Sequence, residues 1–203
     1  MIEAVAFDLF GVLAADQPAP AKAALAAALE VEEPPFWQQY WHWRPAYDVA
    51  ALSDAEYWGN VARSVGRTLD DERLDRLCRL DDASWSGENR PVIEFARRLA
   101  TTGIPLGLLS NIPARLAERL RGIHRWFELF SVAGFSCQLR IAKPDPRAFR
   151  WLTEQLAVRP DRILYIDDRA ENVRAASAHG LQALHFSTVA RLRADWARHA
   201  APA

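Results

Sequence analysis

Four places in the sequence carry polar side chains that together could act on a phosphate group. These side chains are Asp8, Ser110 with Asn111, Lys143, and Asp167 with Asp168. A single carboxylate can attack phosphorus and form an aspartyl-phosphate, and Asp8 is the candidate nucleophile. A magnesium ion would remove the repulsion between this carboxylate and a phosphate dianion. The two acids at 167–168 could supply one direct and one water-mediated contact to that ion.

Two of these places offer hydrogen-bond donors. The Ser110 hydroxyl and the Lys143 ammonium could bind phosphate oxygens. Gly11 lies three residues after Asp8, and a glycine there lets the backbone N–H groups of the turn approach a ligand closely. Each residue also has an ordinary interpretation, Ser110 as a helix cap and Lys143 as a solvated lysine. We favour a joint site because all of these residues lie at or beyond the ends of predicted strands.

The predicted strands are apolar runs of suitable length. They are residues 2–7, 104–109, 130–133, 162–166 and 181–186. Continuous apolar runs are typical of parallel strands that are covered on both faces. The carboxyl ends of such strands lie at one edge of the sheet, where open α/β sheets bind their ligands. Helical patterns alternate with the strands after Pro91, which predicts an α/β fold with a doubly wound, Rossmann-like parallel sheet.

Residues 20–85 show helical patterns and no strand that could join the sheet. Helices are predicted at 21–29, 53–63 and 70–80, and Ser53-Asp-Ala-Glu56 has the pattern of a capping box. Pro34 and Pro35 are expected to break the helical pattern, and a dense aromatic segment follows at 36–43. We therefore expect a core domain of residues 1–15 and 88–203, with an inserted all-helical cap of residues 16–87.

Composition and charge restrict the function classes. A net charge of -1 gives no argument for a nucleic acid, an acidic partner or a membrane surface. There is no apolar stretch of roughly 18 residues that could span a membrane, and no signal-peptide pattern. Cys78 and Cys137 fit neither a metal nor a redox spacing, so a reducing cytoplasm is the expected compartment. A monomer or a homodimer is expected.

Four motifs resemble those of the haloacid dehalogenase-like (HAD) hydrolase superfamily. They are Phe7-Asp-Leu-Phe-Gly-Val-Leu13, Leu108-Leu-Ser-Asn111, Lys143-Pro-Asp-Pro146 and Tyr165-Ile-Asp-Asp-Arg-Ala-Glu-Asn172. They occur in the order typical of the superfamily, and the helical insert resembles its helical cap. The nearest resemblance is to its phosphatases, including bacterial sugar-phosphate phosphatases. It implies a Mg²⁺-dependent hydrolase of a small phosphorylated metabolite.

The resemblance also implies a role for each motif residue. Asp8 would be the nucleophile, and Lys143 would bind phosphate and neutralise the charge of the nucleophile. The implied metal ligands are Asp8, the backbone carbonyl of Phe10, Asp168 and, in the second shell of ligands, Asp167. The implied phosphate- and substrate-binding residues are Phe10, Gly11, Ser110, Asn111 and Lys143. Asn172 would hold the loop of the fourth motif.

Phe10 departs from the pattern of the phosphatases. Most of them carry a second aspartate at this position, which protonates the leaving group and then activates water. General acid–base catalysis contributes typically ~10²–10⁴-fold to a rate. One hypothesis is a phosphatase that does without this aspartate, through a good leaving group or an acid from the cap. Asp16, His42 and Asp48 are the candidate acids.

Two other hypotheses follow from Phe10. A metal-independent 2-haloacid dehalogenase has an aromatic residue at this position. The two acids at 167–168 argue against it, because they would put negative charge where a halo-acid carboxylate must bind. A catalytically weak or inactive protein would instead bind phosphorylated ligands or a protein partner, with Ser110, Lys143 and the acidic pair retained.

The predicted cap contains a compact aromatic and basic cluster of Trp41, Trp43, Arg44 and Tyr47. A cap that closes over a site excludes water and contacts the leaving group. Arg44 is therefore a candidate substrate-binding residue, and the aromatic side chains would suit a sugar phosphate or another polar organic phosphate. The alternative is that these aromatic residues fill the core of the cap itself.

Overall fold

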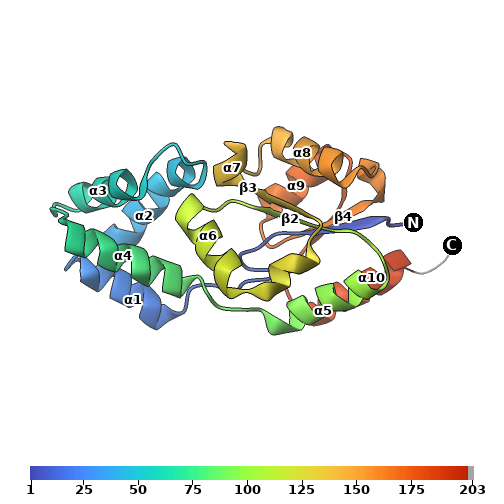
Figure 1. Ribbon diagram of the computed structural model, residues 1–203, viewed down its shortest axis with the longest axis horizontal. Coiled ribbons are helices and arrows are strands. Elements are labelled where there is room, and N and C mark those ends of the chain that lie inside the picture. The colour runs from blue at the N-terminus through green and yellow to red at the C-terminus, as the bar shows by residue number, and fades with distance from the viewer. Residues whose placement is uncertain (201–203) are drawn as a thin grey trace.

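The computed structural model describes residues 1–200, which form a sheet with helices on both faces and a separate group of helices (Figure 1). The strands are β1 (Ala4–Phe7), β2 (Leu106–Ser110), β3 (Val132–Phe135), β4 (Ile163–Asp167) and β5 (Gln182–His185). The helices around the sheet are α5 (Arg90–Thr101), α6 (Ala114–Ile123), α7 (Ser136–Leu139), α8 (Pro146–Leu156), α9 (Ala170–Ala178) and α10 (Val189–Ala200). Short 3-10 turns lie at Arg125–Leu129 and Pro160–Arg162.

The five strands form one parallel sheet in the order β3-β2-β1-β4-β5. This topology confirms the predicted doubly wound α/β fold. The strand order reverses at β1, which lies between β2 and β4. The crevice at such a reversal is where open α/β sheets bind their ligands.

The apolar run of β1 has a direct physical cause. Val5 and Phe7 face the hydrophobic cluster that α5, α6 and α10 complete, whereas Ala4 and Ala6 face the cluster of α8 and α9. Because successive side chains of a strand point to opposite faces, a sheet covered on both sides requires apolar residues at every position. All four residues of β1 are fully buried.

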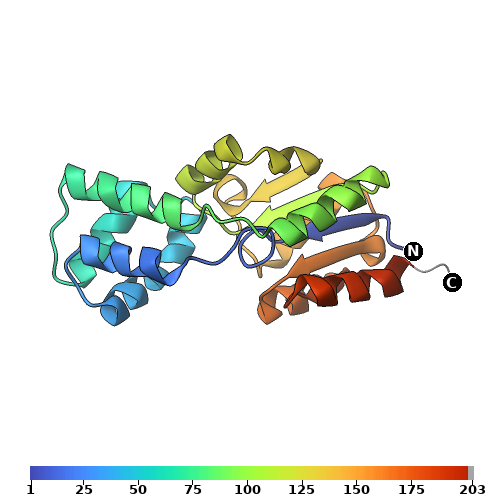
Figure 2. The ribbon, with the colours of Figure 1, turned by 90° about the horizontal axis from the view of Figure 1, so that it is seen from below.

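The helices between β1 and α5 pack around a hydrophobic cluster of their own. They are α1 (Ala19–Ala28), α2 (Glu33–Asp48), α3 (Asp54–Ser64) and α4 (Asp71–Ser84). Figure 2 shows this group at one end of the molecule, beyond the carboxyl edge of the sheet. The predicted capping box is present at Ser53, whose hydroxyl accepts from the backbone N–H of Glu56. Residues 16–87, all of them described, contribute no strand to the sheet.

Several predicted boundaries differ from the structure. The aromatic segment at 36–43 lies inside α2, which begins at Glu33 and has Pro34 and Pro35 in its first turn. Proline suits the first turn because its missing N–H has no intrahelical partner there. The third strand begins at Val132, two residues later than predicted, because Phe130 packs into the core before the chain reaches β3.

The chain leaves and re-enters the sheet domain at adjacent points. The Ala15 N–H donates to the Gly87 carbonyl at 3.0 Å, and the Asn89 N–H donates to the Leu13 carbonyl at 2.8 Å. The two connections therefore lie side by side, and the inserted helices extend from the edge where the nucleophile candidate lies. Within residues 1–200, no helix has both the length and the apolar character that a membrane crossing needs. Both cysteines are buried free thiols.

Candidate active site at the carboxyl edge of the sheet

Asp8 and Lys143 are in direct contact at the carboxyl edge of the sheet. Asp8 follows β1, and Lys143 lies in the loop between α7 and α8. The Lys143 ammonium lies 2.7 Å from Asp8 Oδ1 and 2.9 Å from Asp167 Oδ2 at the end of β4. The ammonium therefore joins two strand ends that are 159 positions apart in sequence.

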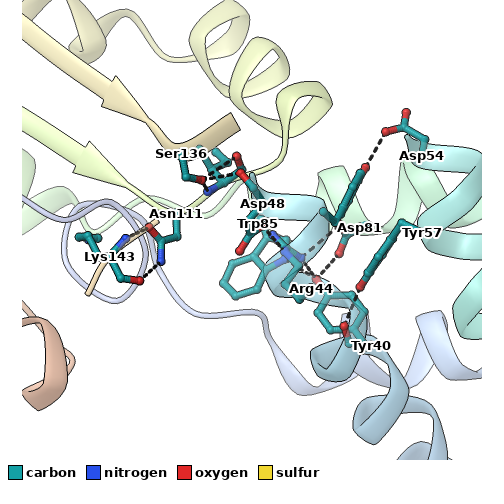
Figure 3. A network of polar contacts seen from close by, with 12 residues as sticks. Tyr40, Arg44, Asp48, Asp54, Tyr57, Asp81, Trp85, Asn111, Ser136 and Lys143 are labelled. Atoms are coloured by element: carbon teal, nitrogen blue, oxygen red, sulfur yellow. Dashed lines mark hydrogen bonds and ion pairs between the residues drawn. The ribbon is translucent and has the colours of Figure 1, made fainter. Parts of the chain in front are cut away.

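Asn111 and Tyr165 hold Lys143 in this position. The Asn111 side chain donates to the Lys143 carbonyl and accepts from its N–H, both at 2.8 Å (Figure 3). The Lys143 ammonium donates to the Tyr165 hydroxyl at 2.9 Å. Asn111 also lines a cavity at this edge of the sheet, and its side-chain hydrogen bonds are with the backbone of Lys143.

Asp167 is fully buried, and its carboxylate accepts several hydrogen bonds. Its carboxylate accepts from Tyr165 at 2.5 Å, from Asn172 at 3.1 Å and from the Arg169 N–H at 2.8 Å. Burial raises the pKa of Asp167, but the Lys143 ammonium and these hydrogen bonds outweigh burial and leave the pKa below its usual value. Asn172 holds this loop, in agreement with the expectation from the motif.

Three carboxylates meet closely enough to bind one cation. Asp8, Asp167 and Asp168 each offer an oxygen, and these oxygens lie within 4.8 Å of one another. Burial and the neighbouring acids raise the pKa of Asp8 despite Lys143, and burial and Asp167 raise the pKa of Asp168. Hard oxygen ligands with surplus negative charge fit Mg²⁺, which would favour the ionised carboxylates.

Gly11 makes room for Asp168. Its φ of 74° is left-handed, and a Cβ at this position would lie 2.4 Å from Asp168 Oδ2. The turn after Asp8 therefore needs glycine both for its backbone conformation and for the approach of the acid. This contact joins the first and the fourth motifs.

Ser110 and Phe10 complete the predicted set. Ser110 is 1 % exposed, and its Oγ has no hydrogen-bond partner in the described part of the chain. A buried hydroxyl without a partner is costly, and a phosphate oxygen would satisfy it. Phe10 lines the cavity, and its ring lies 4.5 Å from that of Trp85.

A cavity of about 620 Å³ lies between the carboxyl edge of the sheet and the inserted helices. Its wall includes, from the sheet domain, Asp8, Phe10, Asn111, Lys143, Asp168, Arg169, Glu171 and Asn172. From the inserted segment it includes Asp16, Gln17, Lys22, Trp41, Arg44, Pro45, Asp48 and Trp85. The volume suits a small organic phosphate.

Arg44 lines this cavity, but its guanidinium already has partners. It lies 2.6 Å from Asp48 and 3.7 Å from Asp81, and it donates to the Tyr40 hydroxyl (Figure 3). The residue is 4 % exposed, so its paired guanidinium is buried. Trp85 donates to the same Tyr40 hydroxyl at 3.0 Å, which ties the cavity wall to this network.

The predicted aromatic cluster divides between two environments. Trp41 lines the cavity together with Arg44, and it is 49 % exposed. Tyr47 stacks on Tyr57 with ring centroids 4.2 Å apart, inside the core of the inserted helices. Trp43 packs against the same core. The interpretation as core packing therefore holds for Trp43 and Tyr47 but not for Trp41.

The three candidate acids differ in whether they line the cavity. Asp16 and Asp48 line the cavity, whereas His42 is exposed and is not part of its wall. Asp48 is held by Arg44 at 2.6 Å. Burial raises the pKa of Asp48, and the charge of Arg44 opposes this effect.

Tyr165, Gln17 and Trp85 line or support the site without having been predicted as functional. Tyr165 lies two residues before Asp167 on a buried strand, and a polar hydroxyl in an apolar run is a signal for a buried partner. Gln17 is 4 % exposed, and its Oε1 has no partner within residues 1–200. Nothing in the local sequence distinguishes Gln17 or Trp85 from ordinary packing residues.

Residues 2–180 match the family model of the haloacid dehalogenase-like hydrolases. The chain therefore belongs to this hydrolase family, in agreement with the resemblance of its four motifs. The match spans both the sheet domain and the inserted helices.

Several relatives carry names that describe an activity. The chain is 32% identical over 136 residues to "Phosphatase MT3486" of Mycobacterium tuberculosis, covering 64% of this chain and 59% of that protein. It is 26% identical over 198 residues to the phosphoglycolate phosphatase of Aliivibrio fischeri, covering 88% and 81%. The (S)-2-haloacid dehalogenase 1 of a Pseudomonas strain is 26% identical over 144 residues, covering 66% and 62%. The chain spans about half the length of the first curated relatives that it matches.

A solved structure shares the fold. It is the HAD family enzyme bt-2542 of Bacteroides thetaiotaomicron, in complex with magnesium and inorganic phosphate. The TM-score is 0.71 at 18% identity, over 92% of this chain and 95% of that chain. At this identity the similarity establishes the fold.

Proposed function

We propose that this chain hydrolyses a small organic phosphomonoester, such as a sugar phosphate, through an aspartyl-phosphate on Asp8. One observation carries the proposal. The Lys143 ammonium lies 2.7 Å from Asp8 at a sheet edge where three carboxylates offer oxygens within 4.8 Å of one another. The names of the phosphatase relatives support the reaction class.

The proposed ligands of Mg²⁺ are Asp8, Asp168 and the backbone carbonyl of Phe10. Asp167 would contact the ion through a water molecule. The bound ion would offset the negative charge of the phosphate and polarise its oxygens. The magnesium complex of the structural neighbour shows that its fold accommodates this ion. The raised pKa of Asp8 supports the same assignment, because a cation favours the ionised form that can attack.

The residues of the chain have distinct roles in the proposed reaction. Lys143 and Ser110 bind phosphate oxygens and orient the phosphorus towards Asp8. The Asp8 carboxylate attacks phosphorus, the bond from phosphorus to the ester oxygen breaks, and the alcohol oxygen leaves with the electron pair and takes a proton from solvent. Water then attacks the phosphorus of the aspartyl-phosphate and loses a proton to solvent, and the bond from phosphorus to the Asp8 oxygen breaks, which releases phosphate and restores the carboxylate. Asn111 and Tyr165 keep Lys143 in place during both steps.

We further propose that residues 16–87 act as a cap over this site and that residues 1–15 and 88–203 form the core domain. The separate hydrophobic clusters of the two parts support this division. The adjacent connections near Ala15 and Gly87 support it as well. A cap in this place would exclude water and contact the leaving group.

Hydrolysis of p-nitrophenyl phosphate with and without Mg²⁺ tests the proposal, with Asp8→Asn as the control. This substrate has a good leaving group, so the absence of a carboxylate at Phe10 matters little. We expect release of nitrophenol that EDTA abolishes and that falls by at least ~10³-fold in Asp8→Asn, as is typical for loss of a catalytic nucleophile.

Two other outcomes point to the alternative functions. Phosphate or vanadate binding without turnover in the wild-type protein would support a phosphate-binding member of the family. Halide release from a 2-haloacid in the presence of EDTA would support a dehalogenase. Either result, together with no nitrophenol release above Asp8→Asn, would refute the proposed phosphatase.

A further inference from the structure

Trp41 is unusual among the tryptophans of this chain. All eight lie in the described part of the structure, and Trp41 is the one that is exposed. Its side chain is 49 % exposed and lines the cavity above Asp8. Burying a large apolar side chain stabilises a protein, so an aromatic surface left open inside a cavity is available to contact a ligand.

Trp41 continues a wall of aromatic rings that reaches the nucleophile. Its ring meets Trp85 edge to face, with centroids 6.3 Å apart, and Trp85 meets Phe10 at 4.5 Å. Phe10 lies two residues after Asp8. The wall thus extends from the inserted helices to the strand end, along the side of the cavity where a leaving group would lie.

A second anionic group on the substrate would find little attraction here. Lys143, Arg44 and Arg169 each lie within 2.7 Å of an acidic partner. Lys22 is the other basic residue in the wall, and within residues 1–200 it has no acidic partner within 4.0 Å. Asp48 and Glu171, the partners of Arg44 and Arg169, line the same cavity, and Asp16 is a further acid in its wall. A carboxylate or a second phosphate would therefore meet no surplus of positive charge.

A cationic leaving group is disfavoured for a different reason. Aromatic walls often bind cations over the faces of their rings. Here the Arg44 guanidinium already lies 5.7 Å from the Trp85 ring centroid and 6.0 Å from that of Trp41 (Figure 3 shows Arg44 beside Trp85). The Arg44 guanidinium therefore already occupies the position that an ammonium group would take over these two rings.

We propose that the cavity selects phosphomonoesters whose alcohol is uncharged and presents a flat ring, which packs against Trp41 and Trp85. This inference rests on the proposed phosphatase function and adds the class of the leaving group. An aromatic alcohol is the simplest member of this class. Trp41 is the specificity-determining residue, because it provides the exposed part of the wall.

Binding of phosphonates tests the class without requiring turnover. The wild-type protein with Mg²⁺ is titrated with benzylphosphonate, ethylphosphonate, phosphonoacetate and 2-aminoethylphosphonate in a calorimeter. These compounds share the phosphorus group but differ in ring and charge. Benzylphosphonate is expected to bind about tenfold more tightly than the other three, the contribution of about one aromatic contact.

Variants of α2 then assign the preference to Trp41. Trp41→Ala is expected to remove the tenfold preference for benzylphosphonate and to leave ethylphosphonate binding within about twofold. Trp41→Phe retains most of the preference because a ring is still present. His42→Ala is the matched control, since His42 is the exposed neighbour outside the cavity wall, and it is expected to bind all four ligands as the wild-type protein does.

The outcomes separate this inference from the proposed function. Tighter binding of phosphonoacetate or 2-aminoethylphosphonate than of benzylphosphonate would overturn the inference, even if p-nitrophenyl phosphate is hydrolysed. If Trp41→Ala weakens the binding of all four ligands equally, the inference is also overturned, because Trp41 would then only support the fold. Selective benzylphosphonate binding in a protein without phosphatase activity would uphold the binding site and refute the reaction.

Discussion

At the residue scale, the buried hydroxyl of Ser110 indicates a contact with a ligand. Its hydroxyl lies at the end of β2 and has no partner within residues 1–200, although the residue is 1 % exposed. A buried polar group without a partner lowers stability. The arrangement is understandable if a phosphate oxygen is its natural partner, since that bond forms when the substrate binds.

Ser110→Ala should separate activity from stability. Loss of a hydrogen bond to a charged group costs about 1.5–3 kcal/mol, so kcat/KM for p-nitrophenyl phosphate should fall roughly ten- to hundredfold. The melting temperature should not fall, because no internal hydrogen bond is lost. Steady-state kinetics and thermal unfolding check these two expectations.

Ser136→Ala is the matched control for this variant. The Ser136 hydroxyl accepts from the Ile112 N–H at 2.8 Å and donates to the Asp48 carbonyl at 2.6 Å. Its removal should lower the melting temperature. If Ser110→Ala unfolds earlier by the same amount while its kcat/KM is unchanged, Ser110 is a structural residue and not a phosphate ligand.

At the scale of the elements, α2 and α4 are joined by a buried charged network. Asp81 of α4 accepts from the Tyr40 hydroxyl at 2.7 Å and lies 3.7 Å from Arg44 of α2. Burial raises the pKa of Asp81 to about 6, and Arg44 opposes the increase. The ionised carboxylate is therefore less stable in the folded protein than in the unfolded chain.

This network predicts a pH dependence of stability. For a carboxyl whose pKa is raised by folding, the stabilising contribution is complete below about pH 4 and is lost as the pH rises through about 6. The shift corresponds to roughly 3 kcal/mol at 1.36 kcal/mol per unit. Asp81→Asn should reduce the loss of unfolding free energy between pH 4 and pH 7 by about this amount, as measured by urea unfolding at each pH.

Asp75→Asn provides the comparison on the same helix, because the Asp75 side chain is 72% exposed. The unfolding free energy of this variant should depend on pH as that of the wild-type protein does. If the unfolding free energy of Asp81→Asn changes with pH as that of the wild-type protein does, Arg44 compensates fully for the burial of Asp81.

At the scale of the whole molecule, the acidic cluster joins separate parts of the sheet domain. Asp8 follows β1, Asp167 ends β4 and Asp168 contacts the turn at Gly11. The proposed cation, bound by Asp8 and Asp168 with Asp167 next to them, would hold these segments together in the folded state and would have no equivalent site in the unfolded chain. Mg²⁺ should therefore stabilise the protein in the absence of any substrate.

The size of this stabilisation follows from linkage. At a hundredfold excess over its Kd, a ligand adds about 2.7 kcal/mol, which for a chain of this size raises Tm by roughly 5–10 °C. Thermal unfolding with Mg²⁺ against EDTA measures the effect. Asp168→Asn should abolish it, whereas Asp161→Asn, on the surface and paired with Arg159, should retain it. Equal shifts in the two variants would contradict a metal site at Asp168.

The local sequence alone determined the strands, the order of the motifs and three of the four inserted helices, α1, α3 and α4. The cause is that a strand buried on both faces must be apolar throughout, as Val5 and Ala6 show from opposite faces of β1. Gly11 was likewise identifiable as the residue of a turn after Asp8, where its φ of 74° favours glycine. These features depend on neighbours that are near in sequence or on rules that apply to every parallel sheet.

The tertiary structure decided what the inserted helices contribute to the site. Arg44 was predicted as a substrate contact, but Asp81, 37 positions further along the chain, takes up part of its charge. Trp41 and Tyr47 have similar sequence surroundings, yet one lines the cavity and the other stacks in the core. Which face of a helix meets a cavity depends on how distant helices pack, and no local pattern in the sequence encodes that choice.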